Sequence, residues 1–304
     1  MPRDRSGGGG GDRGPWARGG GGGADRPRPG APRPPRDRQP QARGPRAEPP
    51  REAHDGPLPP RTNPGELRLH GANAVQAVFA RRPAAIRKVY LLEAMIPRLQ
   101  PLLRWCVAHR VGYRVVGEDD LRRLAGSTHH EGVVADVLPP ASPGFDDWLR
   151  ALPAGPACAL WLDGVGNPHN LGAILRSAAH FGVAGVLVPG DAPLALSGAA
   201  ARVAEGGAEA VPLVDAPADA FARLRRAGFA LVATVVRGGD DLFATALPAR
   251  RVYVLGAEGG GMSVALADAC DRRVSIPGSG AVESLNVAAA TAVLLAQWSQ
   301  GSSP

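Results

Sequence analysis

Lysine is almost absent from this sequence of 304 residues, and cysteine and aromatic residues are scarce. The single lysine, Lys88, does not follow a glycine, so a phosphate-binding loop of the G-K-[ST] type is excluded. The three cysteines lie far apart and form no C-x-x-C pair. This spacing argues against a disulfide framework or a zinc site, and it fits a reducing compartment such as the cytoplasm.

Long apolar runs and targeting signals are lacking as well. The most apolar stretches, such as residues 287–296, extend over about ten residues, whereas roughly 20 are needed to span a bilayer. The N-terminal residues carry charges and glycines but no apolar segment of the kind found in signal peptides. We therefore expect a cytoplasmic protein that makes no membrane contact.

Residues 1–64 differ in composition from the rest of the chain. They hold 15 of the 31 prolines and 14 of the 41 glycines, with few residues that could build a core. They also carry 13 arginines against seven acidic residues, so almost all of the net charge of +7 lies there. We expect a disordered tail that suits a polyanion such as RNA or DNA. A solvated linker is the alternative.

Regular patterns begin at residue 65. Short β-rich runs alternate with helical stretches over residues 65–139, which predicts a small α/β domain. A proline-rich segment around one short helix, residues 140–156, is typical of a linker. Over residues 157–304, continuous apolar runs separated by helices predict a parallel sheet covered on both faces. The last helix, expected over residues 285–300, is apolar enough to be buried against the sheet or at a subunit interface.

The strands expected in the larger domain are 158–162, 185–188, 210–214, 229–236, 252–255 and 273–276. Ligands of parallel sheets bind at the carboxyl ends of the strands. Three loops, residues 163–170, 256–262 and 277–284, each follow an expected strand and precede a helix. The sequence therefore places the candidate site at these loops.

The first loop leads into a helix with Asn170 as its expected N-cap. Arg176, on that helix, is the only charged residue between Asp163 and Asp191. An arginine on an otherwise apolar helix is about as often part of a structural ion pair as a phosphate ligand. Both interpretations stay open at this point.

The second and third loops are rich in glycine. VLGAEGGGMS contains one acid, Glu258, and its glycines do not fit G-x-G-x-x-G, so a nicotinamide-type site is disfavoured. The glycines either let the backbone approach a ligand or merely allow a tight turn. IPGSGAVESLNVAAA contains Ser284 and Asn286, and Ser284 as a simple N-cap is the alternative to a functional role. G-x-S-x-G is absent here, so a serine hydrolase has little support.

No metal site is expected. His129, His130 and Glu131 are adjacent, but the H-E-x-x-H pattern requires a histidine where Val134 stands. Neighbouring residues of a strand also point to opposite faces, so they do not converge on one ion.

Taken together, the three loops resemble the SpoU/TrmH family of RNA ribose 2'-O-methyltransferases in the SPOUT class. NPHNLGAILRSAAHFGV, YVLGAEGGGMS and VSIPGSGAVESLNVAAA resemble motifs 1, 2 and 3 of that family. Residues 65–139, which end in THHEGVVADV, look like its small L30e-like RNA-binding domain. The segment RVAEGGAEAVP, residues 202–212, resembles a less well-defined subgroup. The resemblance implies a parallel sheet whose C-terminal segment passes through a loop as a trefoil knot, against the usual rule for chain paths.

The resemblance also implies a cofactor, S-adenosyl-L-methionine, and a homodimer formed through the knotted domains. The main chain would hold the cofactor at Gly256, Ile276 and Leu285. The catalytic group would comprise Arg176 with Asn170, Glu258, Ser284 and Asn286 around it.

Methyl transfer requires the ribose 2'-oxygen in line with the methyl group, and positioning can supply up to about 7–11 kcal/mol. A guanidinium stays protonated at neutral pH and is a poor general base. We therefore expect Arg176 to clamp the adjacent phosphate and orient the hydroxyl, which leaves the proton acceptor unassigned.

The sequence thus favours an S-adenosylmethionine-dependent methyltransferase acting on rRNA or tRNA, because all five polar motif residues are present. The alternative is an RNA-binding protein of the same fold that has no turnover, in which the tail and the small domain act. A non-RNA acceptor is disfavoured by the small domain and the basic tail.

Overall fold

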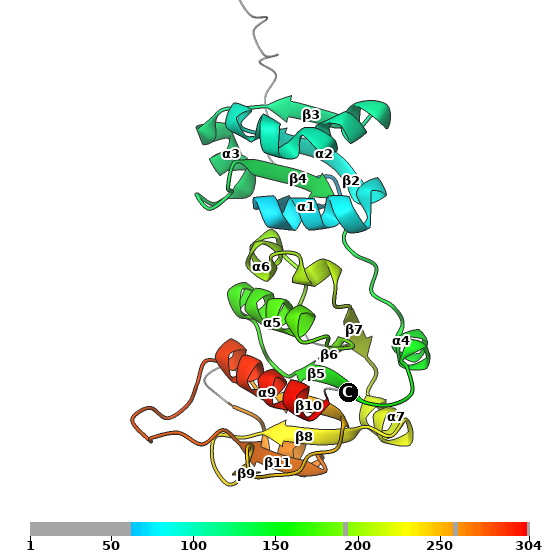
Figure 1. Ribbon diagram of the computed structural model, residues 1–304, viewed down its shortest axis with the longest axis vertical. Coiled ribbons are helices and arrows are strands. Elements are labelled where there is room, and N and C mark those ends of the chain that lie inside the picture. The colour runs from blue at the N-terminus through cyan, green and yellow to red at the C-terminus, as the bar shows by residue number, and fades with distance from the viewer. Residues whose placement is uncertain (1–61, 191–193, 258–260, 303–304) are drawn as a thin grey trace, which may run out of the picture. The chain divides into compact units, whose positions relative to one another are not determined.

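The computed structural model describes residues 62–190, 194–257 and 261–302 (Figure 1). Most of the expected tail, residues 1–61, lies outside this part of the chain. The described residues form two separate β-sheets, one of four strands and one of seven. None of the helices in these ranges combines the length and the apolar character that crossing a membrane requires.

The four-stranded sheet has the order β1-β4-β2-β3. Strand β4 is antiparallel to both β1 and β2, and β2 is parallel to β3. Its strands are β1 (Leu67–His70), β2 (Ile86–Leu91), β3 (Gly112–Val115) and β4 (Val133–Val137), and its helices are α1 (Ala72–Arg81), α2 (Ile96–Ala108) and α3 (Glu118–Ala125).

Both faces of this sheet are covered because successive side chains of a strand point in opposite directions. Val89 and Leu91 of β2 belong to the core that includes residues of α1 and α2. Tyr90 between them packs instead with Leu121 and Leu124 of α3. The small α/β domain expected from the sequence is therefore present.

The seven-stranded sheet has the order β7-β6-β5-β10-β8-β11-β9, and all of its strand pairs are parallel. The prediction of a parallel sheet is confirmed. Strand β9 was not anticipated, because it consists of two exposed aspartates. The strands are β5 (Ala157–Leu162), β6 (Val186–Pro189), β7 (Leu213–Ala216), β8 (Ala230–Thr234), β9 (Asp240–Asp241), β10 (Arg250–Leu255) and β11 (Arg272–Ser275).

Helices cover both faces of this sheet as well. Leu160 and Leu162 of β5 share a core with α5 (Pro168–His180) and α9 (Val287–Ser302). Trp161 of β5 belongs to the opposite core, which includes residues of α4 (Phe145–Ala151) and α7 (Ala220–Arg226). In α9, Leu294, Leu295 and Trp298 are buried, which confirms that the apolar last helix packs within this domain.

Helix α6 (Gly198–Ala204) was not predicted, because seven mostly small residues give no clear helical period. It contributes to two cores at once. Ala200 and Ala204 lie in the core that includes α5 and α9, whereas Ala201 lies in the core of the four-stranded sheet. A 3-10 turn, η3 (Gly207–Glu209), follows it. The remaining short helix is α8 (Val264–Asp268), and η1 (Pro83–Ala85) and η2 (Glu93–Met95) are single turns.

Gly172 allows α5 and α6 to pack closely, and we expect Gly172→Ala to be destabilising. A Cβ at this position would lie 2.5 Å from the Ala200 carbonyl oxygen and 2.7 Å from Val203 Cβ. We expect the free energy of unfolding to fall by about 1–3 kcal/mol, measured by denaturant titration. Gly166→Ala is the control, because nothing lies within 4 Å of its added Cβ. Equal stability of the two variants would contradict this account of the packing.

Candidate active site

The three loops of interest leave the same edge of the seven-stranded sheet. Strands β5 and β10 are adjacent and parallel, with Leu162 opposite Leu255 at their carboxyl ends. Strand β11 runs in the same direction and is separated from β10 only by β8. The loops that follow β5, β10 and β11 therefore begin on one side of the domain, as the sequence predicted.

The first two loops touch each other. The backbone N–H of Asp163 donates to the carbonyl oxygen of Leu255 at 2.9 Å. Gly164 has a φ of +73°, and a Cβ there would lie only 2.7 Å from Ala257 Cβ. A larger residue at position 164 would be strained and would push the second loop away.

The second loop folds back on itself at its glycines. A Cβ on Gly256 would lie 2.5 Å from the backbone nitrogen of Met262. Gly261 has a φ of +65°, and its N–H donates to the Ala257 carbonyl oxygen at 3.0 Å. Glycine is therefore required at both positions by the close packing and the backbone conformation of the turn, whether or not a ligand binds there. Glu258, a predicted site residue in this loop, lies outside the described residues.

The N-cap of α5 is Asn167, so the assignment of this role to Asn170 was wrong. The Oδ1 atom of Asn167 accepts from the His169 N–H at 2.9 Å, and Pro168 occupies the first helical position. Asn170 lies three residues further on. Its Oδ1 atom accepts from Nδ2 of Asn286 at 3.1 Å, which joins the first loop region to the third.

Ser284 as the N-cap of the last helix was also wrong, because α9 begins at Val287. Asn286 takes that role, since its Oδ1 atom accepts from the Ala288 N–H at 2.9 Å. One amide side chain therefore caps α9 and holds Asn170. Ser284 and Leu285 precede it and are exposed.

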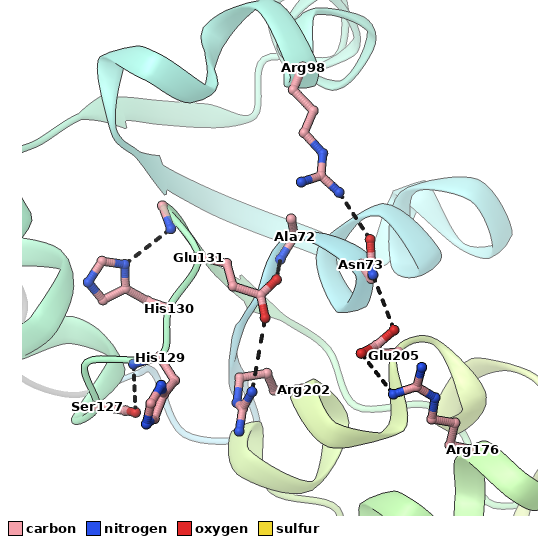
Figure 2. Close-up of polar contacts among 11 residues, drawn as sticks. Ala72, Asn73, Arg98, Ser127, His129, His130, Glu131, Arg176, Arg202 and Glu205 are labelled. Carbon is pink, nitrogen blue, oxygen red and sulfur yellow. Dashed lines mark hydrogen bonds and ion pairs between the residues drawn. The ribbon is translucent and has the colours of Figure 1, made fainter.

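Arg176 lies on α5, and its side chain is 58% exposed. Its Nη1 atom is 2.8 Å from Oε1 of Glu205, the residue directly after α6 (Figure 2). The sequence interpretation missed Glu205. The only signal was an acid in the segment RVAEGGAEAVP, which gave no indication of its partner.

The cysteines and the clustered histidines do not add reactive groups. Burial raises the pKa of Cys158 to about 12 and that of Cys106 and Cys270 to about 11, so their thiolates are scarce at neutral pH. His130 is buried, and its Nδ1 atom accepts from the Gly132 N–H at 3.2 Å. Within the described ranges, no group of three His, Cys, Asp or Glu side chains could hold a metal ion.

Comparisons with known proteins agree with this architecture. The SpoU rRNA Methylase family matches residues 157–296, and the family of RNA 2'-O ribose methyltransferase substrate-binding domains matches residues 68–143. The Uncharacterized tRNA/rRNA methyltransferase YfiF of Escherichia coli O157:H7 is 43% identical over 235 residues, which cover 77% of this chain and 68% of that protein.

Two further relatives bear on the site. The 23S rRNA (guanosine-2'-O-)-methyltransferase RlmB of Pseudomonas syringae pv. tomato is 36% identical, over 75% of this chain and 93% of that protein. The solved SpoU methyltransferase AviRb of Streptomyces viridochromogenes, in complex with the cofactor AdoMet, aligns with a TM-score of 0.63 and 25% identity. That alignment covers 78% of this chain and 90% of AviRb.

The fold and the site define a two-domain α/β enzyme, with a parallel-sheet catalytic domain and a separate domain for its substrate. The chain belongs to the SpoU/TrmH family of RNA ribose 2'-O-methyltransferases. It is an S-adenosylmethionine-dependent RNA methyltransferase whose four-stranded sheet forms the L30e-like substrate-binding domain.

The loops have main-chain groups that suit this cofactor. Within the described residues, the backbone N–H and C=O groups of Ile276 and Leu285 have no hydrogen-bond partner. Gly256 lies at the same edge, where the turn after β10 packs too closely on it to admit a Cβ. A ligand with several polar groups can satisfy such donors and acceptors without any charged side chain.

Proposed function

We propose that this enzyme methylates a ribose 2'-hydroxyl of ribosomal RNA, with Arg176 holding the RNA phosphate beside the reacting sugar. The observation that carries the proposal is the contact between Asn170 and Asn286, since it draws the first and third loops together at the carboxyl edge of the sheet. Helix α5 begins at this contact and presents Arg176 to solvent. Ribosomal RNA is favoured because RlmB, a 23S rRNA methyltransferase by name, matches both domains of the chain.

In this proposal the side chains orient the RNA and the loops, and none of them forms a covalent bond with the substrate or the cofactor. The planar guanidinium of Arg176 binds phosphate oxygens through several N–H donors. Asn170 and Asn286 fix the loops, and the exposed Ser284 hydroxyl hydrogen-bonds to the RNA. Glu258 remains in the proposed site, although it lies outside the described residues.

We assign the cofactor to the main chain of Gly256, Ile276 and Leu285. S-Adenosylmethionine supplies an electrophilic methyl group on a sulfonium. The three backbone segments supply neutral hydrogen bonds and leave the phosphate-binding role to Arg176. We also propose a trefoil-knotted path for the C-terminal segment, as the resemblance to the SpoU/TrmH family implies.

We further propose a homodimer formed through the catalytic domain, working in the cytoplasm. Val264 and Val282 are exposed by 77% and 72%, and Leu285 is exposed by 48%. These apolar side chains lie in the loops after β10 and β11 or at their ends. In a dimer, a second copy of the domain would cover these side chains, and its own apolar surface would lie next to the cofactor loops.

The test begins with cofactor binding by calorimetry, followed by transfer of radiolabelled methyl groups to ribosomal RNA and, separately, to tRNA. Alkaline hydrolysis of the product then leaves resistant dinucleotides, since a 2'-O-methyl group blocks cleavage at its site. We expect label in resistant dinucleotides from ribosomal RNA. Label without resistance would mean base methylation, and label only in tRNA would change the substrate. RNA binding without any transfer would favour an inactive RNA-binding protein.

A further inference from the structure

The segment from Arg202 to Glu209 belongs to the catalytic domain and contacts the substrate-binding domain through three polar interactions. Arg202 Nη1 lies 4.0 Å from Oε1 of Glu131. The carboxylate of Glu209 is almost fully buried and receives two hydrogen bonds from Arg82. Between these two pairs, Oε2 of Glu205 accepts from Nδ2 of Asn73, on α1, at 3.3 Å.

Two glycines fix the distance of this segment from both of its neighbours. A Cβ on Gly206 would lie 2.9 Å from Ala77 Cβ of α1. A Cβ on Gly207 would lie 2.6 Å from the Leu175 carbonyl oxygen and 3.0 Å from Cα of Arg176. The residues after α6 therefore rest directly on α1 on one side and on the backbone of α5 on the other.

Glu205 itself has an unusual conformation. Its φ and ψ are 45° and 44°, in the left-handed region that is unfavourable for residues other than glycine, asparagine and aspartate. This conformation places one carboxylate oxygen on Arg176 and the other on Asn73 (Figure 2). Asn73 in turn accepts from Nη2 of Arg98 at 3.0 Å. A continuous line of polar contacts thus runs from α2 of the substrate-binding domain to Arg176.

The ion pair between Glu205 and Arg176 does little for stability, because both side chains are exposed and such pairs are weak in water. Its effect is on geometry. A free arginine side chain occupies many rotamers, whereas a contact through Nη1 restricts the guanidinium. Among the described residues, Arg176 contacts Glu205 through Nη1 alone, so its Nε and Nη2 donors remain for a phosphate.

We propose that Glu205 is a positioning residue for methyl transfer, which orients the guanidinium of Arg176 according to the position of the substrate-binding domain. The proposal rests on the phosphate-binding role proposed above for Arg176. Glu205 touches neither RNA nor cofactor in this arrangement, and it acts through Arg176. Asn73 is the residue by which the other domain holds the carboxylate.

The test compares Glu205→Gln with Glu131→Gln. Glutamine keeps the size of the side chain but removes the charge that holds Arg176. Glu131 is a matched control, because it also has a left-handed backbone (φ of 52°) and an arginine partner at the same domain boundary. We expect Glu205→Gln to lower kcat by about 10- to 100-fold, as misplaced groups do, with cofactor affinity within about twofold of the wild type. Asn73→Ala should lower kcat in the same direction but less.

A second measurement distinguishes a loss of Arg176 orientation from a general weakening of the contacts between the two domains. In single turnovers with radiolabelled methyl groups, Glu205→Gln should add no further loss to Arg176→Ala, because its effect passes through that side chain. Additive losses, an equal loss for Glu131→Gln, or a normal kcat for Glu205→Gln would each overturn the proposal. Tighter RNA binding with faster transfer by Glu205→Gln would also overturn it, since Glu205 would then be a competitor of the phosphate.

Failure of this inference can be told apart from failure of the proposed function. A wild-type enzyme that transfers no methyl group to RNA contradicts the function itself. Transfer by the wild type that persists in Arg176→Ala contradicts the role of Arg176 and, with it, the inference. Transfer that depends on Arg176 but not on Glu205 contradicts the inference alone.

Discussion

Arg176→Ala should lower kcat by about 100- to 1000-fold, the range seen when a preorganised donor to a reacting group is removed. In the proposed mechanism, alanine cannot bind the phosphate beside the reacting ribose, while the loops assigned to the cofactor remain intact. Methyl incorporation measures the loss, and calorimetry should find the cofactor affinity unchanged.

Arg225→Ala is the matched control for this experiment. Arg225 is also a partly exposed arginine of the same domain, and its Nε atom is 2.8 Å from Asp271. It lies on α7, which packs on the opposite face of the sheet from α5. Its removal should leave kcat within about twofold, as expected for a surface substitution. Near-normal turnover by Arg176→Ala would remove this residue from the mechanism.

Gly256→Ala should weaken cofactor binding by about 10- to 100-fold, the equivalent of losing one or two hydrogen bonds. The added Cβ would meet backbone atoms of Gly261 and Met262 at 2.5–2.7 Å, and backbone atoms cannot rotate away as a side chain can. The turn must therefore open, which displaces the main chain that we assign to the cofactor. Isothermal titration with S-adenosylmethionine measures the effect.

Gly278→Ala serves as the control, because it lies in the third loop and its added Cβ would have nothing within 4 Å. We expect its cofactor affinity to match that of the wild type. If Gly256→Ala also binds normally, the turn after β10 does not form part of the cofactor site. If both variants lose affinity equally, the loss cannot be attributed to the collision at Gly256.

Much of the fold could be read from the sequence because its signals are local. The apolar runs of β5 and β10 predict buried parallel strands, and the loops that follow them must then share an edge. The helix boundaries were harder to place. Asn167 and Asn170 both offer a capping side chain, and Pro168 was the overlooked signal, since proline favours the first position of a helix.

The partner of Arg176 could not be predicted, for a different reason. Arg176 and Glu205 are separated by 29 residues, and they meet only because α5 and α6 pack together. Helix α6 has no amphipathic pattern of its own, since its alanines face two different cores. Nothing in the local sequence therefore indicates that Glu205 faces α5.

The position of α6 has a consequence for how the chain can be divided. Ala201 completes the core of the four-stranded sheet, although it belongs to the polypeptide that follows the connecting segment. Cutting the chain at residues 140–156 would leave the N-terminal fragment without this alanine. It would also expose apolar surface on both fragments. The two halves are therefore poorly suited to exchange between enzymes as independent modules, because each would lose apolar contacts made by α6.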